Sequence, residues 1–457
     1  MTTSTGRASD SSESDLTINL SRWDAPDGSK RTSFEGVPSI LSLTIYIGIS
    51  LFFAWIIIHA WRNPFRPGNN TFSDFYYAAL AIRTSKDLAG ITGYIYPPLL
   101  AFCLQPLTYL PVSAASRIWL IFSFILTSSS MLIGYRALAR AWCLPFSGRV
   151  AMTIISVAIL LSAGEAKTEW SVSQCDGLVL DAFTFSLALI ATHPLAAGIA
   201  IAVGANVKFQ TLILLPYLLW RRQWRVFSSA FVATIILGII PTFSMGWLPM
   251  LRSWEAALGG LGQFVGWHLP MATKVHPLSW NSSISIPSAL SRMLPHFSGG
   301  GSCAVPISGA ILAGMLGACL WLYKRRGLNY GGALDLSAAA HRRLLVLEWC
   351  CLIGILLAFG PQTTRRHCFI LMIVHLLLAV LLIFPILEPR RRWILVASVV
   401  VYQMGLRLPP SVAWCATAAE AWKFCGGPAW CVAGMLAMLM YCALPACQSP
   451  PAHECIT

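Results

Sequence analysis

Charged residues are scarce in this chain. Only 11% of its 457 residues are Asp, Glu, Lys or Arg, whereas a soluble domain carries roughly 25%. Hydrophobic residues make up 56%, and several apolar runs reach the ~20 residues that a helix needs to cross a bilayer. The alternation typical of a membrane barrel is missing. We therefore predict an all-α polytopic membrane protein with about ten to thirteen transmembrane helices.

Motifs for nucleotide and metal chemistry are missing as well. The sequence contains no Gly-rich phosphate loop and no Rossmann pattern. It also lacks a CxxC pair, Cys/His metal spacing and an Asp-x-Asp motif. The 14 cysteines fall mostly in apolar runs, where Cys behaves as a small hydrophobe. We expect neither a metal nor a cofactor.

Basic residues outnumber acidic ones by 32 to 18, a net charge of +14. They cluster in short segments between apolar runs, at 221–225, 324–326, 342–343 and 390–392. This is the pattern of cytoplasmic loops that face anionic lipid. We therefore expect membrane lipids, and no nucleic acid, as partners of a multi-pass protein of the cell membrane.

The chain divides into three parts. Residues 1–36 are rich in Ser, Thr and Asp and predict a disordered cytoplasmic tail. Residues 37–446 predict one multi-span membrane domain, followed by a short tail at 447–457. Segment 97–111 contains four prolines, and it is either a short span or a re-entrant or interfacial helix.

Polar residues interrupt the apolar segment 196–220. Asn206, Lys208 and Gln210 lie at its middle, where a Lys costs roughly 2.5 kcal/mol or more in a membrane. We interpret the segment as two half-helices that meet at an outer, water-filled cavity. The alternative is one long tilted helix whose Lys208 pairs with a distant carboxylate.

Other chemically versatile residues gather on the predicted outer face. Asp74 lies in the polar segment 62–93, and its alternative role is to cap an interfacial helix. Arg365 and Arg366 break the positive-inside pattern, so they are either functional or contact lipid headgroups. His367 either acts in the site or begins the next helix. We interpret Glu165 and Glu169 as solvated loop charges.

Four motifs resemble the integral-membrane glycosyltransferases of family 87 in the GT-C superfamily. The resemblance covers about residues 37–385, although Asp176 stands where the family usually has Asn. The motifs are Asp74–Ala79 with Tyr94–Ala101, Ser173–Asp176, Ala197–Lys208, and Asn281–Ser283 with Gly360–His367.

The resemblance implies an inverting transfer from a polyprenyl-phosphate sugar, most often mannose, to a hydroxyl of a lipid or glycan acceptor. The site would lie on the non-cytoplasmic face. Asp74 would be the general base, and cations would stabilise the departing phosphate. The implied binding residues are Lys208, Arg365, Arg366 and His367 for phosphate, and Gln174, Asp176, Tyr96 and Asn281 for sugar or acceptor.

Two other functions remain open at this point. A polytopic transporter or a flippase of lipid-linked sugars also uses broken helices and a mid-membrane Lys. A non-catalytic scaffold of an envelope-synthesis complex would carry the same helices without needing Asp74, Lys208 or His367.

Overall fold

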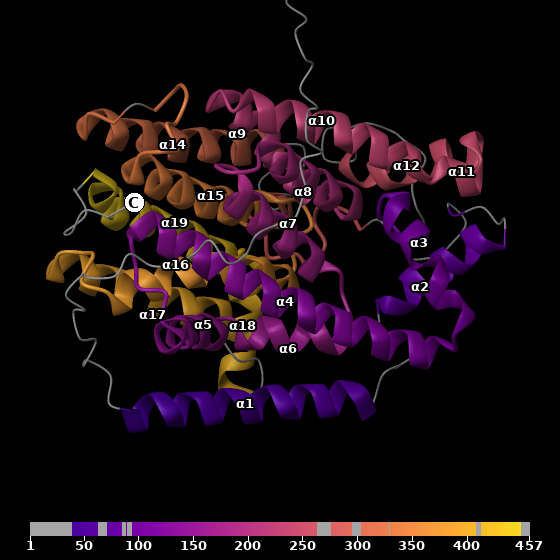
Figure 1. The fold of residues 1–457 in the computed structure, drawn as a ribbon, viewed down its shortest axis with the longest axis horizontal. Helices are drawn as coiled ribbons and strands as arrows, with labels where there is room; N and C mark the ends of the chain where they lie inside the picture. Colours follow the sequence, from indigo (N-terminus) through magenta and orange to yellow (C-terminus); the bar gives the residue numbers. More distant parts are fainter. Residues whose placement is uncertain are drawn as a thin grey trace, which may run out of the picture.

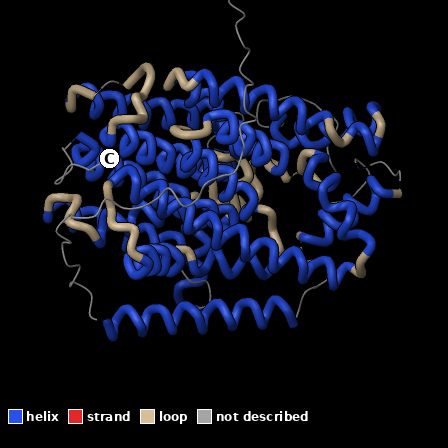
Figure 2. Tube along the Cα trace, in the orientation of Figure 1, coloured by secondary structure: helices blue, strands red, loops and turns tan. Residues whose placement is uncertain are grey.

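The regular structure of this chain is entirely helical in the residues that the computed structural model describes. These are residues 39–62, 71–84, 88, 94–262, 276–294, 303–328, 330–407 and 413–448, and they contain no strand (Figure 2). The predicted all-α class is thus confirmed. The expected tail at 1–36 lies outside the described residues, and the domain boundaries stay predictions.

Most of the apolar runs found in the sequence are helices. In chain order the elements are α1 (Ser39–Arg62), α2 (Phe72–Arg83), α3 (Pro98–Leu104), η2 (Gln105–Tyr109), α4 (Val112–Trp142), α5 (Gly148–Leu161), α6 (Ala163–Val172), α7 (Asp176–Leu189), α8 (Pro194–Val207), η3 (Phe209–Ile213), α9 (Leu214–Trp220), α10 (Trp224–Ile239), α11 (Thr242–Met245), α12 (Trp247–Gly262), α13 (Ile286–Met293), α14 (Ala304–Arg325), α15 (Ala339–Phe359), η7 (Arg365–Leu371), α16 (Met372–Ile383), α17 (Pro389–Arg407), α18 (Ala413–Phe424) and α19 (Gly427–Gln448).

Five of the described helical segments are long and apolar enough to cross a membrane alone, namely α4, α10–α11, α14, η7–α16 and α19. The pair α5–α6, bent by 74°, raises this number to six if it forms one span. The other predicted crossings fall on helices that do not pass the same test. Segments such as α7 and α8, with 14 residues each, reach only about 21 Å at 1.5 Å per residue.

The long helices lie side by side, with α1 along one edge against α5 and α6 (Figure 1). The short helices α2 and α3 gather at one end of the bundle with α11 and α12. Helix α16 forms the centre, because its residues from Met372 to Leu381 are all buried. A helix that is apolar on every side is expected in such a position.

Segment 196–220 is broken at Lys208, as predicted. Helix α8 ends at Val207, Lys208 has extended backbone (φ −157°, ψ 131°), and η3 and α9 follow. Small residues let α8 approach its neighbours closely. A Cβ added at Gly198 would come within 2.7 Å of the backbone of α10, and one at Gly204 within 2.6 Å of Ala182 on α7.

Segment 97–111 is too short to cross the membrane as a helix. Its elements α3 and η2 contain seven and five residues, far fewer than the ~20 that a span requires. This geometry favours the re-entrant or interfacial interpretation.

A buried ion pair ties α9 to the rest of the bundle. Arg221 donates from Nε to Glu348 Oε2 at 2.9 Å, and its side chain is 2% exposed. The hydroxyls of Tyr217 and Tyr323 donate to the same carboxylate at 2.7 and 2.6 Å. The network joins α9, α14 and α15, and it satisfies both Glu348 oxygens.

We expect Glu348→Gln to destabilise the protein by about 3–5 kcal/mol, because it leaves the Arg221 charge buried and unpaired. Thermal unfolding of the purified protein in detergent measures the loss. The control is Glu388→Gln, whose carboxylate is 74% exposed and pairs with Arg391; this change should cost less than about 1 kcal/mol. Equal unfolding temperatures for the two variants would contradict the structural role of Glu348.

Candidate active site

The centre of the candidate site is an ion pair between Lys208 and Asp176. Asp176 is the first residue of α7 and is fully buried, while the Lys208 side chain is 13% exposed. Buried charges are stable only when they are paired. The alternative of one long helix is therefore wrong, although the carboxylate partner that it expected for Lys208 is present.

Glu169 is a second buried carboxylate beside this pair. It is 1% exposed, and its charge interacts with those of Asp176, Lys208 and Arg366. Its Oε1 accepts a hydrogen bond from the Gly177 backbone N–H at 3.3 Å. The expectation of a solvated loop charge was wrong here, because residues 163–172 form α6 and turn Glu169 inward.

Several polar atoms of the cluster are buried without a hydrogen-bond partner among the residues that the structure describes. They are Asp176 Oδ2, Glu169 Oε2 and Arg366 Nε. Buried polar atoms in native proteins are nearly always paired, so each such exception requires an explanation. A polar ligand bound between these groups would explain the exceptions, because it would complete their hydrogen bonding.

Helix α2 begins against the junction of α6 and α7. The Thr71 backbone N–H donates to Val172 O at 2.9 Å, and Gln174 Nε2 donates to Thr71 Oγ1 at 3.0 Å. Asp74 follows in the first turn of α2 and is half-buried. The N-cap residue is Thr71 rather than Asp74.

Tyr96 links Gln174 to Lys208. Its hydroxyl donates to Gln174 Oε1 at 3.4 Å, and Lys208 Nζ lies 5.8 Å from the centre of its ring. Burial raises the pKa of Tyr96, while the nearby Lys208 charge opposes this change, so the hydroxyl remains protonated at neutral pH. The Trp119 indole N–H donates to the carbonyls of Ser173 and Gln174 at 3.2 and 3.3 Å and holds this turn in place.

The turn at 360–367 contributes Arg366 and His367. His367 Nδ1 accepts a hydrogen bond from the Thr364 backbone N–H at 3.1 Å, which caps η7. The alternative role of His367 as a helix start is therefore present in the structure. An imidazole that accepts at Nδ1 carries its proton on Nε2, and the charges of Lys208 and Asp176 act on this ring.

Arg365 pairs with a different carboxylate. Its Nε lies 3.6 Å from Glu165 Oε1, and Arg407 Nη2 lies 3.4 Å from Glu165 Oε2. Glu165 is 1% exposed, so its interpretation as a solvated loop charge was also wrong. The charge of Arg366 acts on Asp176, whereas Arg365 is paired with Glu165.

The last family motif comes together without Asn281. Ser283 Oγ donates to Thr363 O at 3.2 Å, and Ser288 Oγ donates to Pro361 O at 2.8 Å. These bonds anchor the turn that carries Arg366. Asn281 is exposed in the preceding turn, and the structure places it outside the buried cluster.

The chain matches the family model of glycosyltransferase family 87 over residues 94–347, more than half of its length. It belongs to this family. The matched region contains Tyr96, Gln174, Asp176 and Lys208, whereas Asp74 precedes it. No curated protein matches the chain. This family 87 protein is a multi-pass membrane glycosyltransferase, a class consistent with hexosyl transfer.

Among the described residues, no group of three or more His, Cys, Asp or Glu side chains is placed to hold a metal ion. Metal-independent activity stays a prediction. Glu169 is the functional candidate that the sequence analysis missed. The available signal was a pair of acidic residues, Glu165 and Glu169, one helical turn apart between two apolar runs.

We expect Lys208→Met and Asp176→Asn each to destabilise the enzyme by about 3–5 kcal/mol, since each leaves a buried partner unpaired. The double variant should recover part of this loss, with a coupling energy of about 1 kcal/mol or more. Thermal unfolding of all four proteins completes the cycle. Strictly additive losses would show that the two side chains do not stabilise each other.

Proposed function

We propose that this glycosyltransferase moves a sugar, most often mannose in its family, from a polyprenyl-phosphate donor to a hydroxyl of a lipid or glycan acceptor. The proposed site is the cluster around Lys208, on the non-cytoplasmic face, and the reaction inverts the anomeric carbon. The observation that carries the proposal is this buried cluster of cations and carboxylates, with unpartnered polar atoms, at one end of the membrane helices.

The donor phosphate needs positive charge as the sugar leaves it. Lys208 and Arg366 supply two cations, and the Nε2–H of His367 supplies a neutral donor. Fixed charges stabilise a departing phosphate strongly in a site with little water, and Arg can bind it through two hydrogen bonds. Asp176 keeps Lys208 charged and in position, and Arg365 assists through the Glu165 pair that orders η7.

The acceptor needs a base. In the proposed reaction the acceptor oxygen attacks the anomeric carbon, the bond from that carbon to the phosphate oxygen breaks, and Asp74 takes the acceptor proton. Gln174, Asp176, Tyr96 and Glu169 offer hydrogen bonds to sugar hydroxyls, and Asn281 is a candidate for acceptor contact at the rim.

A lipid-linked donor fits the position of the site. The short helices α2 and α3 lie at the end of the bundle, beside helices that are long enough to cross the bilayer. A donor whose chain remains in the bilayer can present its phosphate there without a soluble nucleotide site. Family membership favours this transfer over the transporter or flippase interpretation.

We expect Asp74→Asn to lower the transfer rate by at least about 100-fold, because an amide cannot accept the acceptor proton. The assay follows labelled sugar from polyprenyl-phosphate mannose to a crude envelope-lipid acceptor pool, with purified protein in lipid at equal folded yield. The matched control, Glu388→Gln, removes an exposed carboxylate and should keep the wild-type rate. Equal rates for wild type and Asp74→Asn would remove Asp74 from the mechanism.

We also expect transfer to continue in EDTA, because Lys208 and Arg366 provide the positive charge at the phosphate. The rate is measured with and without the chelator, and again after adding magnesium or manganese. A complete loss in EDTA that either ion restores would show that a metal, rather than these side chains, stabilises the leaving group.

A further inference from the structure

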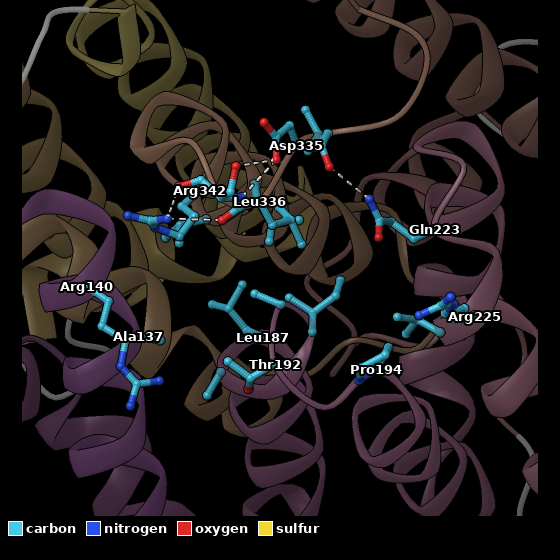
Figure 3. A pocket seen from close by; sticks show the side chains of 18 of the residues that line it. Ala137, Arg140, Leu187, Thr192, Pro194, Gln223, Arg225, Asp335, Leu336 and Arg342 are labelled. Atoms are coloured by element: carbon cyan, nitrogen blue, oxygen red, sulfur yellow. Dashed lines mark hydrogen bonds between the residues drawn. The ribbon is translucent and has the colours of Figure 1, made fainter. Parts of the chain in front are cut away.

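A cavity lined by arginines and apolar side chains lies at the other end of α7 from the candidate active site. It has a volume of about 820 Å³, and its lining includes four arginines, Arg140, Arg222, Arg225 and Arg342. We call it the arginine pocket. Figure 3 shows Arg140, Arg225 and Arg342 on different sides of it.

The same helices connect the two sites. Helix α7 begins at Asp176 in the candidate active site and reaches the arginine pocket at Leu187, and α8 runs back from Pro194 to Val207, beside Lys208. Helix α15 contributes Arg342 to the pocket near its first turn. At 1.5 Å per residue, the 14 residues of α7 separate the two sites by about 20 Å.

The charge of the pocket is strongly positive. One acidic residue, Asp335, also lines it, which leaves a net formal charge of +3. Asp335 is turned toward its own loop, where the hydroxyl and the backbone N–H of Ser337 both donate to Oδ1. Arg342 Nη1 donates to the carbonyls of Leu336 and Ser337, while Arg222 and Arg225 are exposed.

The pocket is also amphipathic. Its floor includes the apolar side chains Leu187, Ile190, Leu345 and Val346, and Trp224 lies at its exposed edge. Arginine and tryptophan together at the end of membrane helices are typical of the headgroup region. A water-soluble anion would use only the arginines, whereas a lipid would cover both the charged and the apolar parts.

Arg222 occupies an unusual backbone conformation for its side chain. Its φ is +52°, at the position after α9 where glycine is preferred. The backbone N–H of Arg222 donates to Leu219 O and that of Gln223 to Leu218 O, which fixes this turn. This left-handed conformation ends α9 and fixes the direction in which the chain enters α10.

We propose that the arginine pocket binds an anionic membrane lipid, with the lipid phosphate at Arg222 and Arg225 and an acyl chain over the apolar floor. The acceptor and donor of the transfer reaction are not required for this binding. The pocket lies at the other end of α7 from the proposed active site, so lipid binding there is independent of Asp74 and Lys208.

The test is native mass spectrometry of the purified full chain with equal amounts of phosphatidylglycerol and phosphatidylcholine that carry the same acyl chains. We expect wild type to retain phosphatidylglycerol preferentially. Replacing Arg222 and Arg225 by Gln should weaken this binding about fivefold for each arginine removed. Arg225→Lys keeps the charge and should retain most of the preference.

The control variant is Arg326→Gln, which removes an exposed arginine after α14 that does not line the pocket. It should bind phosphatidylglycerol as wild type does. Equal retention of the two lipids by wild type, or an unchanged preference in the Arg222→Gln/Arg225→Gln variant, would overturn the proposal. Displacement of the lipid by millimolar glycerol phosphate would also overturn it, since the pocket would then select a soluble anion.

Discussion

The ion pair between Lys208 and Asp176 is the constraint on which the rest of the candidate site depends. A charged Lys in an apolar segment needs a partner, and Asp176 at the start of α7 provides it. The pair fixes the end of α8 against the start of α7. The preceding turn then holds Gln174, which in turn bonds Thr71 and Tyr96. The position of α2, and with it Asp74, follows from these contacts.

The sequence predicted the features that follow from the cost of charge in a membrane. Low charge content indicated the all-α membrane class, and the position of Lys208 predicted the broken helix. It did not predict the burial of Glu165 and Glu169, because their partners are distant in the chain. Arg365 and Arg407 pair with Glu165, and the charges of Lys208 and Arg366 act on Glu169. The local sequence around Glu165 and Glu169 does not indicate which distant residues they contact.

The neighbouring residues Arg365 and Arg366 are a second case in which the sequence did not indicate the partner of a charged side chain. The sequence placed both at the phosphate, yet Arg365 pairs with Glu165, and Arg366 lies near Asp176. They begin a 3₁₀-helix, in which successive side chains point about 120° apart. Two adjacent arginines therefore face different carboxylates. The capping of η7 by Thr364 and His367 fixes where the two arginines lie along this turn.

Arg221 and Arg222, at the other end of the bundle, are likewise two adjacent arginines with different roles. Arg221 is buried against Glu348, so its charge is fully used in joining α9 to α15. Arg222, which has a left-handed backbone conformation, lines the arginine pocket instead. Because η3 and α9 follow Lys208 and end at Arg221, an ion pair at each end holds this segment in position. A basic cluster of the kind expected at cytoplasmic loops thus contains one residue that maintains the fold and one that remains available to a ligand.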